Sequence, residues 1–87
     1  MVREGESVRT LKQVRAERML TTRELAVKAG LSHATVHMAE TGKAIPRLRA
    51  VRQLAAALEV DPLEVVELRQ AIELAGRGRS EEGKAAA

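Results

Sequence analysis

Two histidines, His33 and His37, stand four residues apart and are the side chains of this chain best suited to chemistry. On a helix, this spacing puts both imidazoles on one face, where they could bind a divalent metal ion or donate to hydrogen-bond acceptors. Glu40, one turn further on, could serve as a third ligand. Two histidines alone do not make a metal site, so we expect no metal and no cofactor.

No pair of a nucleophile and a general base is persuasive in this sequence. Cysteine is absent, and the few serine and threonine hydroxyls lie where helix caps and helix starts are expected. The absence of cysteine also excludes disulfides and thiolate metal sites within the chain. We therefore expect that the protein is not an enzyme.

The histidines belong to a stretch, residues 21–42, whose pattern is that of two short helices joined by a glycine. Thr21 and Glu24 have the spacing of a capping box, which begins the first helix. Gly30 follows where the chain must turn, because glycine adopts positive φ at low cost. Ser32 is the candidate N-cap of the second helix, which is largely polar. The pattern predicts a helix-turn-helix, although an αα-hairpin in a generic bundle would share it.

Apolar residues at helical spacing predict five helices and no strand, so the expected fold class is all-α. Asp61 followed by Pro62 is an N-cap with proline at the first helical position, which begins the last helix. We expect Gly76 and Gly78 to end that helix. The expected helices cover, in order, residues 8–19, 22–29, 33–40, 47–58 and 62–75. The second and third should turn these side chains toward the core: Leu25, Ala26, Ala29, Val36 and Ala39.

The chain length of 87 residues is enough for one small domain and too short for a second core. Residues 1–7 are expected to form a flexible N-terminus, and residues 8–75 the folded domain. Residues 76–87, with the sequence GRGRSEEGKAAA, are small, polar and charged, which predicts a disordered tail. No run of about 18 apolar residues and no signal-peptide core is present, so we expect a cytoplasmic protein that does not meet a membrane.

The net charge of +3 hides an uneven distribution along the chain. Residues 1–58 hold 11 Lys and Arg against 5 Asp and Glu, a net +6, whereas residues 59–87 hold 4 against 7, a net −3. A basic face attracts the phosphate backbone of nucleic acids, and this attraction weakens as salt rises. RNA-binding modules that stack bases on aromatic side chains are disfavoured, because the chain has no Phe, Tyr or Trp.

Residues 9–68 resemble the Cro/phage-repressor family of helix-turn-helix DNA-binding domains, often called the Xre family. The matching segments occur in the family's order and nearly without gaps; they are LKQVRAERML, LTTRELAVKAGLSHATV, ETGKAIP and LAAALEVDPLEV. The resemblance implies a five-helix, lambda-repressor-like domain from a bacterium or phage. Its second and third helices would form the helix-turn-helix, with residues 33–40 as the recognition helix in the major groove.

The resemblance also implies a structural ion pair between Arg15, late in the first helix, and Glu40, at the end of the recognition helix. This role competes with the use of Glu40 as a metal ligand. Thr22 stands where the family often has glutamine, so it offers phosphate a hydroxyl in place of an amide. Ala39 stands where the family often has a bulky apolar residue, so we expect a thinner core there.

The resemblance assigns two sets of candidate DNA contacts. Imidazoles can donate to guanine acceptors or to phosphate, whereas alanine and methionine offer only apolar contact. The base-facing candidates are His33, Ala34, Thr35, His37 and Met38. Phosphate contacts are expected from hydroxyls, cations and helix starts around the rim, although ordinary solvated charge is the alternative for each arginine and lysine. These candidates are Thr22, Arg23, Ser32, Lys43, Arg47 and Arg49.

The function expected from these features is that of a sequence-specific, double-stranded DNA-binding transcriptional regulator associated with the nucleoid. One alternative is the DNA-binding antitoxin or accessory component of a two-protein system, whose C-terminal helix or tail binds a partner protein. Another is an adaptor that keeps the fold but binds only proteins. A homodimer on two half-sites is the usual solution for so small an interface. Candidate dimer contacts are Leu68, Ile72 and Ala75, which could instead pack on the first and fourth helices.

Overall fold

The structure is a computed structural model that describes the backbone of residues 8–86 and the side chains of residues 8–76. The helices, in chain order, are α2 (Leu11–Glu17), α3 (Thr22–Ala29), α4 (His33–Thr41), α5 (Leu48–Leu58), the 3-10 helix η1 (Pro62–Glu64) and α6 (Val66–Ala86). The predicted all-α fold is confirmed for the part of the chain described. None of these helices combines the length and the apolar character needed to cross a bilayer.

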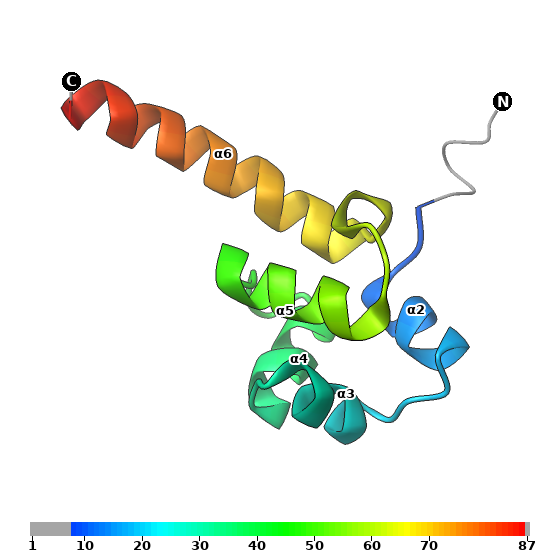
Figure 1. The fold of residues 1–87 in the computed structure, drawn as a ribbon. Coiled ribbons are helices and arrows are strands. Elements are labelled where there is room, and N and C mark those ends of the chain that lie inside the picture. Colours follow the sequence, from blue (N-terminus) through cyan, green and yellow to red (C-terminus); the bar gives the residue numbers. More distant parts are fainter. Residues whose placement is uncertain (1–7, 87) are drawn as a thin grey trace, which may run out of the picture.

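The helices α2 to α5 form one group, and α6 lies across it. Figure 1 shows α6 passing over α5 and continuing well beyond the group, while α3 and α4 lie on the opposite side of the molecule. The surface of α3 and α4 is therefore far from the projecting end of α6.

Among the residues described, the core consists of aliphatic side chains. Val36 from α4 is fully buried and Ala39 is nearly so, as predicted, and the same holds for the α3 residues Leu25, Ala26 and Ala29. Alanines at these positions let the helices approach closely. The largest fully buried side chains come from every α-helix and from the residue between η1 and α6; they are Leu11, Val14, Leu25, Val36, Val51, Leu54, Leu58, Val65 and Leu68.

The predicted cap at the start of α3 is present, and a matching one precedes it. The Thr21 hydroxyl accepts from the backbone N–H of Glu24, and the Glu24 carboxylate accepts from the N–H of Thr21. Thr10 and Gln13 make the same reciprocal pair at the start of α2. Each box satisfies two backbone donors that a helix leaves without an intrahelical partner.

The first and last helices begin later than predicted, and one contact explains both differences. Arg9 lies in extended backbone beside Val65, with its N–H donating to the carbonyl of Glu64 at 2.9 Å and its carbonyl accepting from Val66 at 2.8 Å. This bridge keeps residues 8–10 out of α2 and interrupts the predicted fifth helix after η1. At the other end, α2 stops at Glu17 because Met19 takes a positive φ of 59°.

The last helix does not end at Gly76 and Gly78, as we expected, but continues to Ala86. Glycine disfavours a helix by about 1 kcal/mol relative to alanine, yet nothing in its geometry forbids helical dihedrals. The predicted division into residues 1–7, 8–75 and 76–87 stays a prediction. Residues 1–7 lie outside the residues described.

A side chain of α6 caps α2 from a distance of 56 residues in sequence. The Glu67 carboxylate accepts a hydrogen bond from the backbone N–H of Leu11 at 2.7 Å, in a partly buried setting. Leu11 is the first residue of α2, so its N–H has no intrahelical acceptor. This bond ties the start of the first helix to the start of the last.

Replacing Glu67 by alanine should therefore lower the free energy of unfolding by about 1 to 2 kcal/mol. Denaturant unfolding followed by circular dichroism measures the change, since the chain has no aromatic fluorophore. Glu73→Ala is the matched control, because Glu73 lies on the exposed surface of the same helix, 3.6 Å from Arg69. The control should lose less than about 0.5 kcal/mol. Equal losses in the two variants would contradict the capping role.

Candidate nucleic-acid interface

The connection between α3 and α4 has the geometry of a tight helix-turn-helix. Gly30 ends α3 with φ of +73°, the left-handed conformation for which glycine was expected. The next residue, Leu31, is half-buried against the core and donates its N–H to the carbonyl of Ala26 at 2.9 Å. Ser32 then caps α4 by accepting from the N–H of Thr35 at 3.1 Å. Two helix ends and a turn are thus completed within a few residues.

The α4 helix buries one narrow face and the side chain of Glu40, and it exposes its other residues. Val36 and Ala39 are its buried side chains. The candidate base-facing residues lie on the remaining surface and are exposed; they are His33, Ala34, His37 and Met38, which the spacing predicted to point outward, and Thr35. The helix therefore offers a continuous outward surface on which no side chain is needed for packing.

The two histidines stack on each other. Their ring centroids are 6.2 Å apart and their planes differ by 11°. No group of three or more metal-ligating side chains is assembled anywhere in the described part of the chain. Glu40, the third ligand considered from the sequence, has both carboxylate oxygens directed at Arg15.

The Arg15 and Glu40 side chains form the ion pair that the resemblance implied. Arg15 Nε donates to Glu40 Oε2 at 2.6 Å and Nη2 donates to Oε1 at 3.2 Å, so the contact is bidentate. Arg15 Nη1 also donates to the carbonyl of Leu20 at 2.8 Å. The two side chains are only 14% and 7% exposed. The last turn of α4 is therefore fixed to α2 and to the segment that leads into α3.

Five of the six candidate phosphate contacts fall into two groups. Thr22 and Arg23 lie in the first turn of α3, where Arg23 is exposed and Thr22 is half-buried. Lys43, Arg47 and Arg49 lie on the connection from α4 to α5 and in the first turn of α5, and all three are exposed. Arg47 occupies the N-cap position of α5 without a capping bond from its side chain. Its guanidinium is therefore not needed to form the helix.

Ser32 differs from the other phosphate candidates because its hydroxyl already has two contacts. It accepts from the N–H of Thr35 and lies 2.8 Å from the Thr35 hydroxyl. One further hydrogen bond to phosphate is compatible with an exposed serine hydroxyl.

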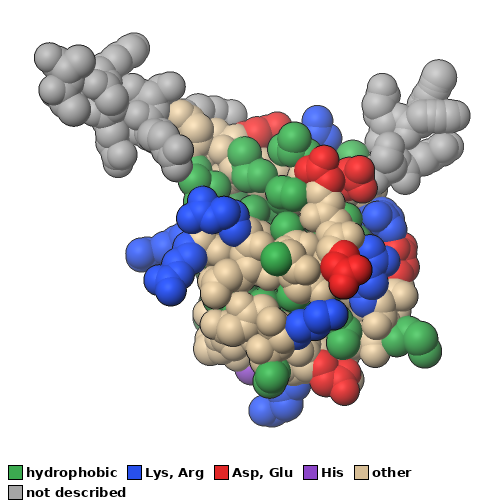
Figure 2. All heavy atoms as spheres, in the orientation of Figure 1, with side chains coloured by type: hydrophobic (Ala, Val, Ile, Leu, Met, Phe, Trp, Pro, Cys, Tyr) green, Lys and Arg blue, Asp and Glu red, His purple; other side chains and the backbone are tan. Residues whose placement is uncertain are grey.

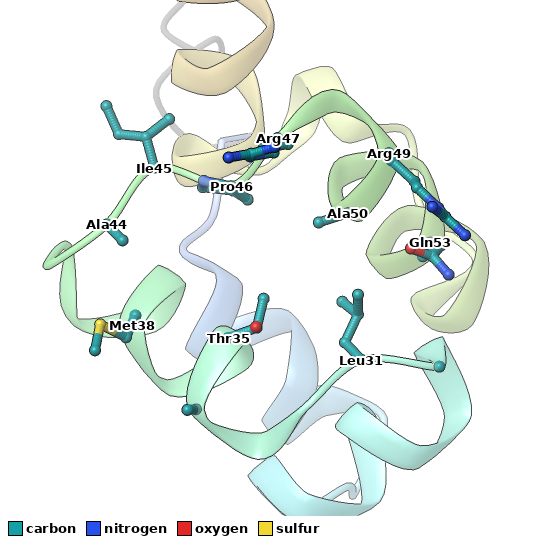
Figure 3. A pocket seen from close by; sticks show the side chains of 12 residues that line it. Leu31, Thr35, Met38, Ala44, Ile45, Pro46, Arg47, Arg49, Ala50 and Gln53 are labelled. Atoms are coloured by element: carbon teal, nitrogen blue, oxygen red, sulfur yellow. The ribbon is translucent and has the colours of Figure 1, made fainter.

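A cleft of about 510 Å³ separates α4 from the start of α5. Figure 3 shows Leu31 and Thr35 pointing into it, Met38, Ala44 and Ile45 on one side, and Arg49 and Gln53 on the other. Five residues of this lining are candidates from the sequence; they are Ala34, Thr35, Met38, Arg47 and Arg49. Ile45, which is 55% exposed, is not among the residues predicted from the sequence. The sequence hints at a role for Ile45 only in that a large apolar residue stands in a segment of small and polar residues between two predicted helices.

The charge near the start of α5 is positive. The cleft lining includes Arg47 and Arg49 and no carboxylate. Figure 2 shows Lys and Arg side chains gathered on the left of the molecule, on the side where Figure 1 places the start of α5, without described acidic side chains among them in that view. This surface suits a polyanion.

The apolar strip of α6 is mostly used within the chain. Leu68 is fully buried in the core of its own chain, so it has no surface to offer a second copy. Ile72 is partly buried against the same core, and Ala75 is half-buried. For Leu68 the structure thus favours the alternative in which the strip packs on the other helices.

Breaking the Arg15 and Glu40 pair should destabilise the fold strongly. Glu40→Ala should lower the free energy of unfolding by about 3 kcal/mol or more, because a largely buried guanidinium loses its carboxylate. The double variant Arg15→Met, Glu40→Leu should recover much of that loss, since apolar pairs often replace buried ion pairs at little cost. A double-mutant cycle of unfolding free energies measures both effects. A loss below about 0.5 kcal/mol in Glu40→Ala would rule out a stabilising role for the pair.

Comparison with protein families gives one match, to a family described as a helix-turn-helix domain, which covers residues 8–68. Searches of curated proteins and of solved structures returned no match. The match spans well over half of the chain and includes α2, α3, α4, α5 and η1. The chain therefore belongs to this DNA-binding helix-turn-helix family, which is of the Cro/phage-repressor type.

Proposed function

We propose that the protein is a sequence-specific, double-stranded DNA-binding transcriptional regulator of a bacterium or phage, acting in the cytoplasm at the nucleoid. One observation carries the proposal: α4 exposes a surface of side chains that the core does not use, and the Arg15–Glu40 pair holds that helix in place. A helix of this diameter fits the major groove, and rigid placement is what reading base edges requires.

In this proposal, α4 lies in the major groove and α3 crosses the phosphate backbone. His33 and His37 donate to base acceptors, and Thr35 contributes at the edge of the surface. Thr22, Arg23 and Ser32 contact phosphates near the start of α3 and α4, and the cations on the α4–α5 connection contact phosphates on the other side. The exposure of Arg23, Ser32, Lys43, Arg47 and Arg49 supports this arrangement.

Selection of bound duplexes from a random pool tests the proposal as a whole. We expect enrichment of a defined half-site and binding that weakens as salt rises. An unenriched pool, with no salt-dependent shift of any duplex, would exclude DNA binding and favour the adaptor alternative.

The division between base and phosphate contacts can be tested with two variants. Arg47→Ala should weaken binding to all duplexes and reduce the salt slope by about 0.9, the value of one phosphate contact. His33→Ala should instead change the preference at one position of the site. Arg69→Ala is the control, because Arg69 is an exposed arginine on α6 that pairs with Glu73. If Arg47→Ala and His33→Ala weakened every duplex equally, the division would be wrong.

We further propose that the protein binds its site as a homodimer through the part of α6 that is not fully buried, including Ile72 and Ala75. Light scattering should give the mass of a dimer for the wild type at micromolar concentration, alone or with DNA. Ala75→Glu should give a monomer with unchanged helix content, because a charge on a half-buried contact opposes association. A wild-type monomer under both conditions would exclude the homodimer and leave α6 as a surface for a different protein partner.

A further inference from the structure

Two large apolar side chains are exposed on the side of α4 proposed to face DNA. Met38 is 42% exposed and Ile45 is 55% exposed. Both line the cleft between α4 and α5, together with the exposed side chains of Ala34 and Ala44. We call these four residues the apolar patch. Ile45 lies outside the recognition helix, so the patch is formed only by the fold.

The apolar patch is held in a defined shape by the backbone. Gly42 ends α4 with φ of +77°, which turns the chain back toward the helix. The N–H groups of Lys43 and Ala44 then both donate to the carbonyl of Met38, at 3.0 and 3.3 Å. Proline at position 46 restricts the backbone after Ile45. The backbone just before Ile45 is therefore held to the end of α4, and Met38 and Ile45 line the same side of the cleft (Figure 3).

The residues around the apolar patch are suited to binding DNA. DNA itself presents few apolar groups that the patch could contact. Arg47 and Arg49 line the same cleft, and no carboxylate does. Phosphates and sugars offer hydrogen-bond acceptors, and most base edges offer donors or acceptors. The C5 methyl group of thymine is the one apolar group that a base pair presents in the major groove.

We infer that the apolar patch reads the C5 methyl group of a thymine, so that part of the sequence preference depends on this methyl. The inference rests on the proposed function and names the chemical group of the base that the patch recognises. The stacked histidines on α4 would read hydrogen-bonding groups, while Ala34, Met38 and Ile45 would read methylation of a pyrimidine ring. Burying one methyl is worth enough free energy for a change of about fourfold in affinity.

Deoxyuridine substitution in the selected duplex tests the inference directly, because uracil pairs as thymine does and lacks only the methyl. Each thymine of the half-site is replaced in turn, and binding of the wild-type protein is measured at fixed salt. We expect about fourfold weaker binding at one or two positions and no change at the others. Equal affinity at every position overturns the inference while leaving specific DNA binding intact.

Variants of the apolar patch connect the effect to the residues. Met38→Gln and Ile45→Ser should bring the thymine-to-uracil affinity ratio at the sensitive position close to one. Both side chains are exposed, so circular dichroism should show unchanged folding. Val27→Ser is the matched control, because Val27 is 81% exposed on α3 and is not part of the cleft lining. A ratio that stays unchanged in both patch variants would assign the methyl effect to other residues and overturn the inference.

A third measurement separates the methyl from the rest of the base. At the sensitive position, a duplex with 5-methylcytosine opposite guanine should bind about fourfold more tightly than the same duplex with cytosine. Equal binding of the two cytosine duplexes would contradict readout of the methyl. Absence of specific binding to any duplex would overturn the proposed function, and the inference would fall with it.

Discussion

The ion pair between Arg15 and Glu40 fixes the last turn of the helix proposed to read DNA, which otherwise packs on α3 and the core through small side chains. Of the nine residues of α4, Val36 and Ala39 are the buried ones, and both side chains are small. The bidentate contact between Arg15 and Glu40 adds a partly buried, charge-assisted anchor at the last turn. Such a contact fixes orientation as well as distance, because a planar guanidinium accepts a carboxylate in one geometry. The outward face of α4 is thus free to carry any side chains that DNA requires.

The other helices of the domain are held together partly by hydrogen bonds between residues that are far apart in the sequence. Arg18 Nε donates to the carbonyl of Leu58 at 2.8 Å, which satisfies an acceptor at the end of α5. The Glu67 carboxylate accepts from a backbone N–H at the start of α2. The backbone bridge between Arg9 and Val65 joins the segment before α2 to the segment before α6. Aliphatic side chains pack without strong directional preference. In a core without aromatic residues, these hydrogen bonds therefore help to fix the orientation of the helices.

The resulting surface combines three kinds of chemistry within a short distance along the chain. Imidazoles, apolar side chains and arginines all lie between His33 and Arg49. The histidines, Ala34 and Met38 lie on α4, and Ala44 and Ile45 lie on the connection that follows it. The arginines come from the start of α5 across the cleft. Base edges and phosphates lie at different depths of the major groove, so a surface divided in this way can contact both.

Much of the local structure was predictable because its causes are local. The capping box at Thr21, the turn at Gly30 and the cap at Ser32 each depend on residues at most three positions apart, and all three are present. The exposed face of α4 followed from helical spacing around Val36 and Ala39. The Arg15–Glu40 pair, 25 residues apart, came from family resemblance and not from any local pattern.

The features that sequence reasoning missed depend on contacts between distant residues. The bridge of Arg9 with Val65 shortened the first helix and split the last, and neither residue carries a local signal for it. Burial of Leu68 was decided by which helices α6 crosses, since its spacing fits a core face and an exposed strip equally well. The sequence by itself determined the helices, their caps and the surface residues of α4. Only the tertiary structure placed Ile45 and Met38 on one cleft, because the path of a loop without periodicity is set by the hydrogen bonds that hold its backbone.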